Sequence, residues 1–189
     1  IQGSYLTAEV IIIPLTAWLA RALSTRTLFA LSSGLFTLAS LLCGSAWDIN
    51  SMILFRVLQG LAGGTMIPLV FSTIYTIFPP ERRAGTIVIV ALVANVAPTT
   101  GPTLGGWLTQ LLSWQWLFYI NLLPGAVVTY VIWKTVDIDR PNYALLKQID
   151  ILGVILIAMF LGPLVFLLEE GPRKDWFSSS TMIVVAIIS

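Results

Sequence analysis

Long apolar runs alternate with short polar connections along the whole chain. A helix that crosses a bilayer needs about 20 predominantly apolar residues. On that rule the pattern predicts a seventh span that begins near Ser180, after six spans at residues 1–20, 27–46, 52–78, 86–112, 116–133 and 151–168. The fold class is therefore an all-α polytopic membrane protein, and the open run at the end leads us to interpret the chain as a fragment truncated at both ends.

Basic residues are distributed unevenly over the connections. The side with few cations receives Arg173 and Lys174, whereas the other side receives seven: Arg21, Arg26, Arg82, Arg83, Lys134, Arg140 and Lys147. Loops rich in lysine and arginine remain in the cytoplasm. The first span is therefore predicted to run inward, and residues 134–150 are predicted to form a solvated cytoplasmic linker.

Composition excludes several classes of protein. Hydrophobic residues make up 57% of the chain and charged residues 10%, against about 25% charged in soluble domains. The chain has no histidine, and Cys43 is its one cysteine. We therefore expect no metal site, no cofactor, no catalytic centre and no enzyme activity, and the net charge of +1 gives no indication of nucleic-acid binding.

Arg56 is the only charge in the third span. A charge inside a membrane helix is costly and marks a functional site by default. Gln59, Gly60, Gly63 and Gly64 follow it at helical spacings of three and four, so they share one face with it. Two interpretations stay open: Arg56 faces the bundle interior beside a small-residue packing face, or it snorkels to the outer interface.

The fourth span carries a second unusual face. Pro98 and Pro102 remove two backbone donors, and Gly101, Gly105 and Gly106 leave the helix without bulk on that side. Such a helix can act as a hinge, or it can be a packing helix that is merely kinked.

Glu9 lies about midway along the first span. A carboxylate removed from water has a raised pKa and could carry a proton. It could equally be a partner of Arg56, a contact for cationic substrates, or a solvated group near the outer surface.

These residues together resemble the major facilitator superfamily. Residues 54–64, with Arg56, Gln59 and Gly60, look like that family's fourth-helix motif. Gly101, Pro102, Gly105 and Gly106 look like its G-P-x-x-G-G antiporter motif. The loop after the first span departs from the family pattern, since Arg21 and Ser24 stand where the family has aspartate and glycine.

The resemblance extends to the fourteen-span EmrB/QacA-type branch. It implies that residues 1–133 form spans two to six of the amino-terminal bundle, that 134–150 link it to the rest, and that 151–189 hold inserted helices seven and eight. The first span and the second bundle would then be missing from this fragment.

The implied function is proton-coupled multidrug efflux by alternating access, in the bacterial cytoplasmic membrane. Its substrates would be hydrophobic or cationic compounds and protons, with a periplasmic adaptor and an outer-membrane channel as partners in a Gram-negative source. Arg56, Gln59 and Glu9 would couple protons, and the glycine–proline helix would govern closure. An exporter of one metabolite, such as a siderophore, sugar or amino acid, and a non-transporting receptor or scaffold are the alternatives.

Overall fold

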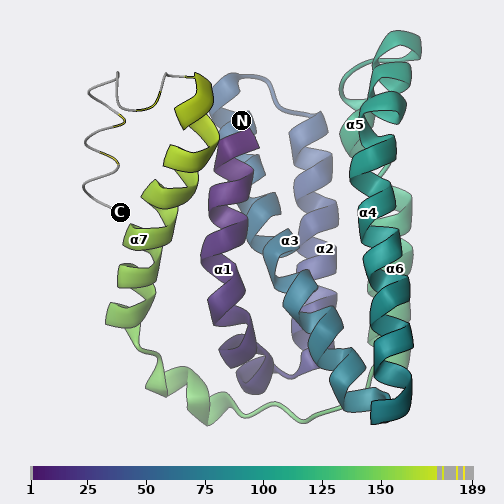
Figure 1. The fold of residues 1–189 in the computed structure, drawn as a ribbon, viewed down its shortest axis with the longest axis vertical. Coiled ribbons are helices and arrows are strands. Elements are labelled where there is room, and N and C mark those ends of the chain that lie inside the picture. Colours follow the sequence, from purple (N-terminus) through teal and green to yellow (C-terminus); the bar gives the residue numbers. More distant parts are fainter. Residues whose placement is uncertain (1, 174–175, 177–181, 183–184, 186–189) are drawn as a thin grey trace.

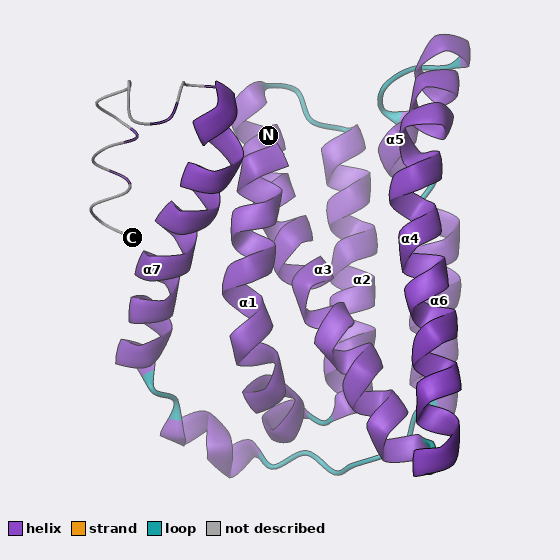
Figure 2. Cartoon of the chain, in the orientation of Figure 1, coloured by secondary structure: helices purple, strands orange, loops and turns teal. Residues whose placement is uncertain are grey.

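The computed structural model describes residues 2–173, 176, 182 and 185. This part of the chain consists of helices joined by loops, with no strand (Figure 2). Its α-helices are α1 (Gln2–Leu23), α2 (Thr25–Gly44), α3 (Ile49–Ile77), α4 (Pro80–Leu111), α5 (Trp116–Tyr119), α6 (Leu122–Thr135) and α7 (Ile151–Glu170). Two short 3-10 helices, η1 (Tyr143–Gln148) and η2 (Gly171–Arg173), flank α7.

The six predicted spans are confirmed. Six stretches in the described residues are long and apolar enough to cross a membrane, with α5 and α6 together forming the fifth, Trp116–Thr135. The expected single helix is interrupted at Ile120 and Asn121, where the Asn121 side chain donates to the Leu117 carbonyl at 3.5 Å. The predicted start of a further span near Ser180 lies outside the described residues.

The helices run alternately up and down, so their connections gather at two ends (Figure 1). The α1–α2 turn, the α3–α4 turn and the α6–α7 connection share one end. These are the connections that carry the seven basic residues. The structure therefore places them on one side of the bundle, as the positive-inside prediction requires.

Specific side chains define where α3 starts and ends. At its start, Asp48 and Ser51 form a capping box: the Ser51 N–H donates to Asp48 Oδ1 at 2.8 Å, and the Asp48 N–H donates to Ser51 Oγ at 3.2 Å. At its end, Arg83 donates from Nε to the Phe78 carbonyl at 2.9 Å and from Nη2 to the Tyr75 carbonyl at 2.8 Å. Both ends of this long helix are thus held by hydrogen bonds.

The core of the structure lies among α1, α2 and α3. Helix α3 packs most extensively on α1 and α2, α2 also packs on α6, and α7 packs on the other side of α1 (Figure 1). Helix α4 has no buried residue and only a small contact with α3 and α5. The helix with the unusual charge is therefore central, and the glycine–proline helix is peripheral.

Candidate functional site

The α1–α3 interface is built on the predicted glycine face. A Cβ atom at Gly60 would collide with the carbonyl oxygen of Tyr5, and one at Gly64 would collide with that of Glu9. At Gly63 the nearest atom would be the Tyr5 hydroxyl oxygen, at 2.8 Å. Glycine lets two membrane helices bring their backbones together, so these three positions set the approach of α1 to α3.

Arg56 begins a chain of polar contacts directed into the bundle. Its Nη1 donates to Gln59 Oε1 at 3.3 Å, and Gln59 Nε2 donates to Ser40 Oγ on α2 at 2.7 Å. The Cys43 thiol lies 3.9 Å from the same Gln59 oxygen. Gln59 is only 2% exposed, so the network is enclosed between α2 and α3.

Two aromatic rings flank the guanidinium of Arg56. Its Cζ lies 4.6 Å from the ring centroid of Phe118 on α5 and 5.8 Å from that of Tyr5 on α1. Arginine is attracted to the face of such rings within about 6 Å. The contacts with α1 and α5, together with the link through Gln59 to α2, place Arg56 against the bundle interior, which is the first of the two interpretations left open by the sequence.

A buried donor of Arg56, its Nε, has no hydrogen-bond partner among the described residues. Buried donors are nearly always paired in folded proteins, and each exception calls for an explanation. The guanidinium therefore retains hydrogen-bonding capacity for a further group.

Glu9 is close to this network without joining it. It is half-buried on α1, one helical turn after Tyr5. The Tyr5 ring lies 5.8 Å from Arg56 Cζ, and no ion pair joins Glu9 to Arg56 in the described part of the chain. The interpretation of Glu9 as a direct partner of Arg56 is therefore not supported in this arrangement, where Tyr5 is near both groups.

The antiporter-like face of α4 meets almost nothing in this structure. A Cβ atom at Gly101 or Gly106 would have no neighbour within 4 Å, and one at Gly105 would lie 3.7 Å from Leu117 Cδ2. The helix continues unbroken through Pro98 and Pro102. Its glycine side is thus an open face, without a packed hinge among the described residues.

The basic residues of the connections differ in what they contact. Arg26 stacks on Trp133 of α6, with its Cζ 4.9 Å from the ring centroid. Arg83 holds the end of α3, as described above, whereas Arg21 and Arg82 are exposed. Two of the four predicted loop residues therefore also have a structural role.

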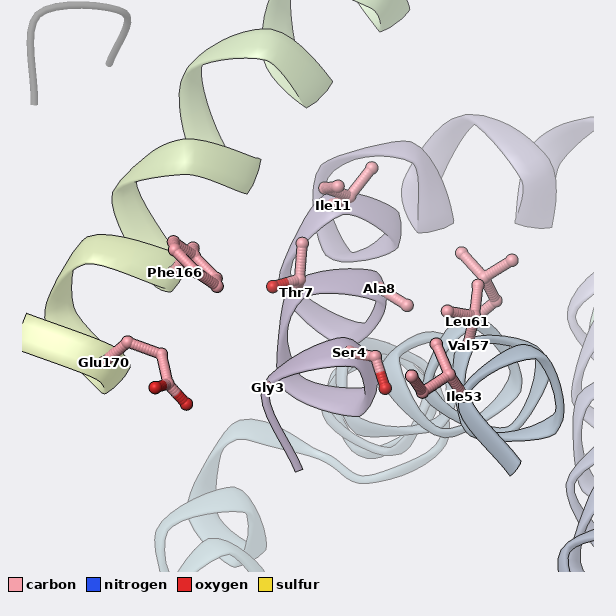
Figure 3. Close-up of a pocket in the computed structure, with 10 residues that line it drawn as sticks. All are labelled: Gly3, Ser4, Thr7, Ala8, Ile11, Ile53, Val57, Leu61, Phe166 and Glu170. Atoms are coloured by element: carbon pink, nitrogen blue, oxygen red, sulfur yellow. The ribbon is translucent and has the colours of Figure 1, made fainter. Parts of the chain in front are cut away.

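A largely apolar cavity lies between three of the helices, and its lining includes none of the residues of the Arg56 network. It has a volume of about 500 Å³ and opens between α1, α3 and α7 (Figure 3). Its lining is Gly3, Ser4, Thr7, Ala8, Ile11, Ile53, Val57, Leu61, Phe166 and Glu170. Apolar walls with few polar groups are typical of sites for hydrophobic small molecules.

Over the residues that were described, no three His, Cys, Asp or Glu side chains are grouped to hold an ion.

Six membrane-length helices, one of which carries a half-buried arginine, define a polytopic membrane protein. The chain belongs to the Major Facilitator Superfamily, whose family profile matches residues 1–189. This is a family of transporters rather than of enzymes, and the chain is a multi-pass protein of the bacterial inner membrane.

Several curated relatives match almost the whole chain. It is 39% identical over 188 residues to the colistin resistance protein EmrB of Acinetobacter baumannii, covering 100% of this chain and 37% of the relative. It is 36% identical over 186 residues to the multidrug export protein EmrB of Haemophilus influenzae, covering 98% and 36%. It is 34% identical over 184 residues to the fatty acid resistance protein FarB of Neisseria gonorrhoeae, covering 97% and 36%. The chain thus spans little more than a third of the length of these relatives.

Sequence reasoning did not identify three members of the Arg56 network: Tyr5, Ser40 and Phe118. Each lies on a helix other than α3, and even Ser40, the nearest of them in sequence to Gln59, is 19 residues away from it. Their types, a small hydroxyl and two aromatics, are common in membrane helices. No local pattern could have separated them from ordinary packing residues.

Proposed function

We propose that the full-length protein is a proton-coupled multidrug efflux transporter that works by alternating access. The observation that carries the proposal is the placement of Arg56 inside the bundle, hydrogen-bonded to Gln59 and flanked by Phe118 and Tyr5. An intramembrane arginine held in this way is expected to have a function, because a purely structural role does not require a charge there.

In this proposal Arg56 acts as a fixed cation that controls a proton-carrying acid. A neighbouring positive charge favours the deprotonated form of a carboxyl group. Glu9 is the candidate acid within this chain, one helical turn after Tyr5, whose ring lies 5.8 Å from Arg56 Cζ. Gln59 would orient the guanidinium. On the fourth span, Pro98, Gly101, Pro102, Gly105 and Gly106 would govern closure against parts of the protein outside this segment.

The proposed substrates are hydrophobic, amphipathic or cationic compounds. The apolar cavity between α1, α3 and α7 supports this substrate class, and Glu170 contributes a carboxyl group to its lining. The relatives' names, which refer to colistin resistance, fatty acid resistance and multidrug export, favour the same class over a single metabolite or a receptor role. A periplasmic adaptor and an outer-membrane channel are the proposed partners.

The proposed organisation follows the family. Residues 1–133 would belong to the amino-terminal bundle, 134–150 to the linker and 151–189 to two inserted helices.

Ethidium transport into everted membrane vesicles tests the proposal. Arg56→Ala in the full-length protein is expected to abolish proton-driven transport while the amount of folded protein in the membrane stays near that of the wild type. Lys134→Ala, which removes an exposed cation at the end of α6, is the matched control and is expected to transport normally. Normal transport by Arg56→Ala would refute the role given to this residue.

A further inference from the structure

The connection between α6 and α7 is tied to the bundle by one aspartate. The Asp139 carboxylate accepts two bonds from the Thr25 backbone N–H, at 2.8 Å to Oδ1 and 3.1 Å to Oδ2. It accepts a third from Thr25 Oγ1, at 3.1 Å to Oδ2. The two residues are 114 positions apart in the sequence, so this contact fixes a distant segment and is not a local turn.

Thr25 is the first residue of α2, and this explains why a carboxylate binds there. The first N–H groups of a helix have no partner within the helix, and the helix dipole favours negative charge at this end. Ser24, the N-cap residue, uses its own side chain on Thr27. Asp139 therefore satisfies a donor that the local cap leaves open.

A second bond connects the same segment to the end of α1. The Asn142 N–H donates to the Arg21 carbonyl at 3.4 Å. The connection thus contacts both sides of the α1–α2 turn, where Ser24 has φ 75°, a conformation that glycine adopts more easily. The turn and the connection hold each other in place at the end of the bundle (Figure 1).

This contact closes one side of a second cavity. The cavity has a volume of about 380 Å³ and lies between α1, α3 and the connection, with Thr16, Pro68, Ser72, Ile138 and Asp139 among its lining residues. Ile138 and Asp139 are the parts of its wall that do not come from a membrane helix. Thr16, also in the lining, is only 1% exposed.

We propose that residues 136–142 form a strap that closes this cavity between α1 and α3 at its cytoplasmic end. The hydrogen bonds from Thr25 to Asp139 hold the strap in place. The strap must leave Thr25 when this cavity opens to the cytoplasm. The cycle in which it opens and closes rests on the proposed transport function, whereas the closure itself rests on the contacts above.

Thiol labelling tests the closure independently of transport. The experiment uses the full-length protein, freed of other cysteines, with Thr16→Cys as the reporter in everted vesicles and a membrane-impermeant maleimide on the cytoplasmic side. Asp139→Asn is expected to raise the labelling rate by about tenfold, the scale that follows from losing hydrogen bonds to a charged acceptor.

Asp137 provides the control, because it is an exposed aspartate in the same segment. Asp137→Asn is expected to leave the labelling rate unchanged. Equal labelling in the wild type and Asp139→Asn, or an equal rise in both variants, would overturn the strap.

Cross-linking tests whether release is needed for transport. Thr25→Cys with Asp139→Cys is joined by a short, reducible bifunctional thiol reagent. Joining is expected to stop ethidium transport and reduction to restore it, while Thr25→Cys alone is unaffected by the reagent. Full transport by the cross-linked protein would overturn the strap. If the protein that carries only the Thr16→Cys reporter labels as expected and yet transports no compound, the result would instead count against the proposed function.

Discussion

Helices α3 and α4 carry the same kind of motif and use it differently. Both have glycines four residues apart, at Gly60 and Gly64 in α3 and at Gly101 and Gly105 in α4. In α3 a Cβ atom at either position would collide with the backbone of α1. In α4 the same addition would meet no atom at Gly101 and only a side-chain methyl at Gly105.

The polar side chains of α3 and α4 differ in the same way as their glycines. Gln59 and Thr65 of α3 are buried and hydrogen-bonded to side chains on α2. Asn95 and Thr100 of α4 are exposed and bond only to carbonyls of their own helix. A small-residue pattern therefore indicates that a partner is expected, but whether the partner lies in this segment depends on the tertiary structure.

The largest expected effect comes from adding bulk to the two glycine faces. Gly64→Leu in the full-length protein is expected to cost about 3 kcal/mol or to prevent folding, because the obstructing atoms belong to the α1 backbone and cannot move aside. Gly101→Leu is expected to leave the thermal midpoint nearly unchanged. Fluorescence-detected size exclusion of heated samples measures both. A comparable loss in Gly101→Leu would contradict the difference and show that α4 has a close partner in the whole protein.

The buried amide of Gln59 gives the next effect. Gln59→Leu leaves the Arg56 guanidinium and the Ser40 hydroxyl without a partner, which is expected to cost about 2 kcal/mol. Asn95→Leu in α4 removes a bond within one helix at an exposed position, and its expected effect stays within about 0.5 kcal/mol. Unfolding in a mixed detergent series compares the two. Equal losses would show that burial is not what separates these helices.

A smaller effect is expected for one hydrogen bond between helices. Thr65 Oγ1 donates to Ser32 Oγ at 2.5 Å. A double-mutant cycle with Thr65→Val and Ser32→Ala should give a coupling of about 0.6 kcal/mol, the typical value between membrane helices. Thr100→Val on α4, whose hydroxyl bonds to its own helix, should show no coupling with Ser32→Ala, and measurable coupling there would contradict the arrangement.

The smallest expected effect is a pH dependence of stability that comes from the start of α3 and not from the start of α4. Hydrogen bonds from Ser51 lower the pKa of the exposed Asp48 carboxyl at the start of α3, whereas Pro79 gives α4 no side-chain cap. A lowered pKa means that the stabilisation is present above the ordinary value of about 4 and is lost as the pH falls through the folded value. Asp48→Asn, which keeps a good cap without the charge, should flatten this part of the profile. If the thermal midpoint of the wild type changed with pH below pH 4 in the same way as that of Asp48→Asn, the stabilising role of the Asp48 carboxylate would be refuted.

The membrane spans could be predicted from the sequence because each is a long apolar run between polar connections. The position of Arg56 and Gln59 on one face also followed from helical spacing. The partners of that face could not be predicted, since Ser40, Tyr5 and Phe118 reach it from three other helices. Asp139 is a further example: it read as part of a solvated linker, and only the fold brings it to the start of α2.

Two residues of the α1–α2 turn, Arg21 and Ser24, differ from the family pattern, and the structure shows what each contacts or adopts. Ser24, where the family has glycine, adopts a positive φ, which is the conformation for which glycine is suited. Arg21, where the family has aspartate, is exposed and contacts the connection through its carbonyl. The α1–α2 turn thus has a positive φ at Ser24, and the start of α2 after it binds the carboxylate of Asp139.

Substrate-induced proton release tests the central claim most directly, that Arg56 inside the bundle couples protons to substrate. Purified full-length protein in weakly buffered detergent is mixed with ethidium while a pH indicator records released protons. The wild type is expected to release protons, and Arg56→Ala is expected to release none although it remains folded. Proton release by Arg56→Ala equal to that of the wild type would contradict the account.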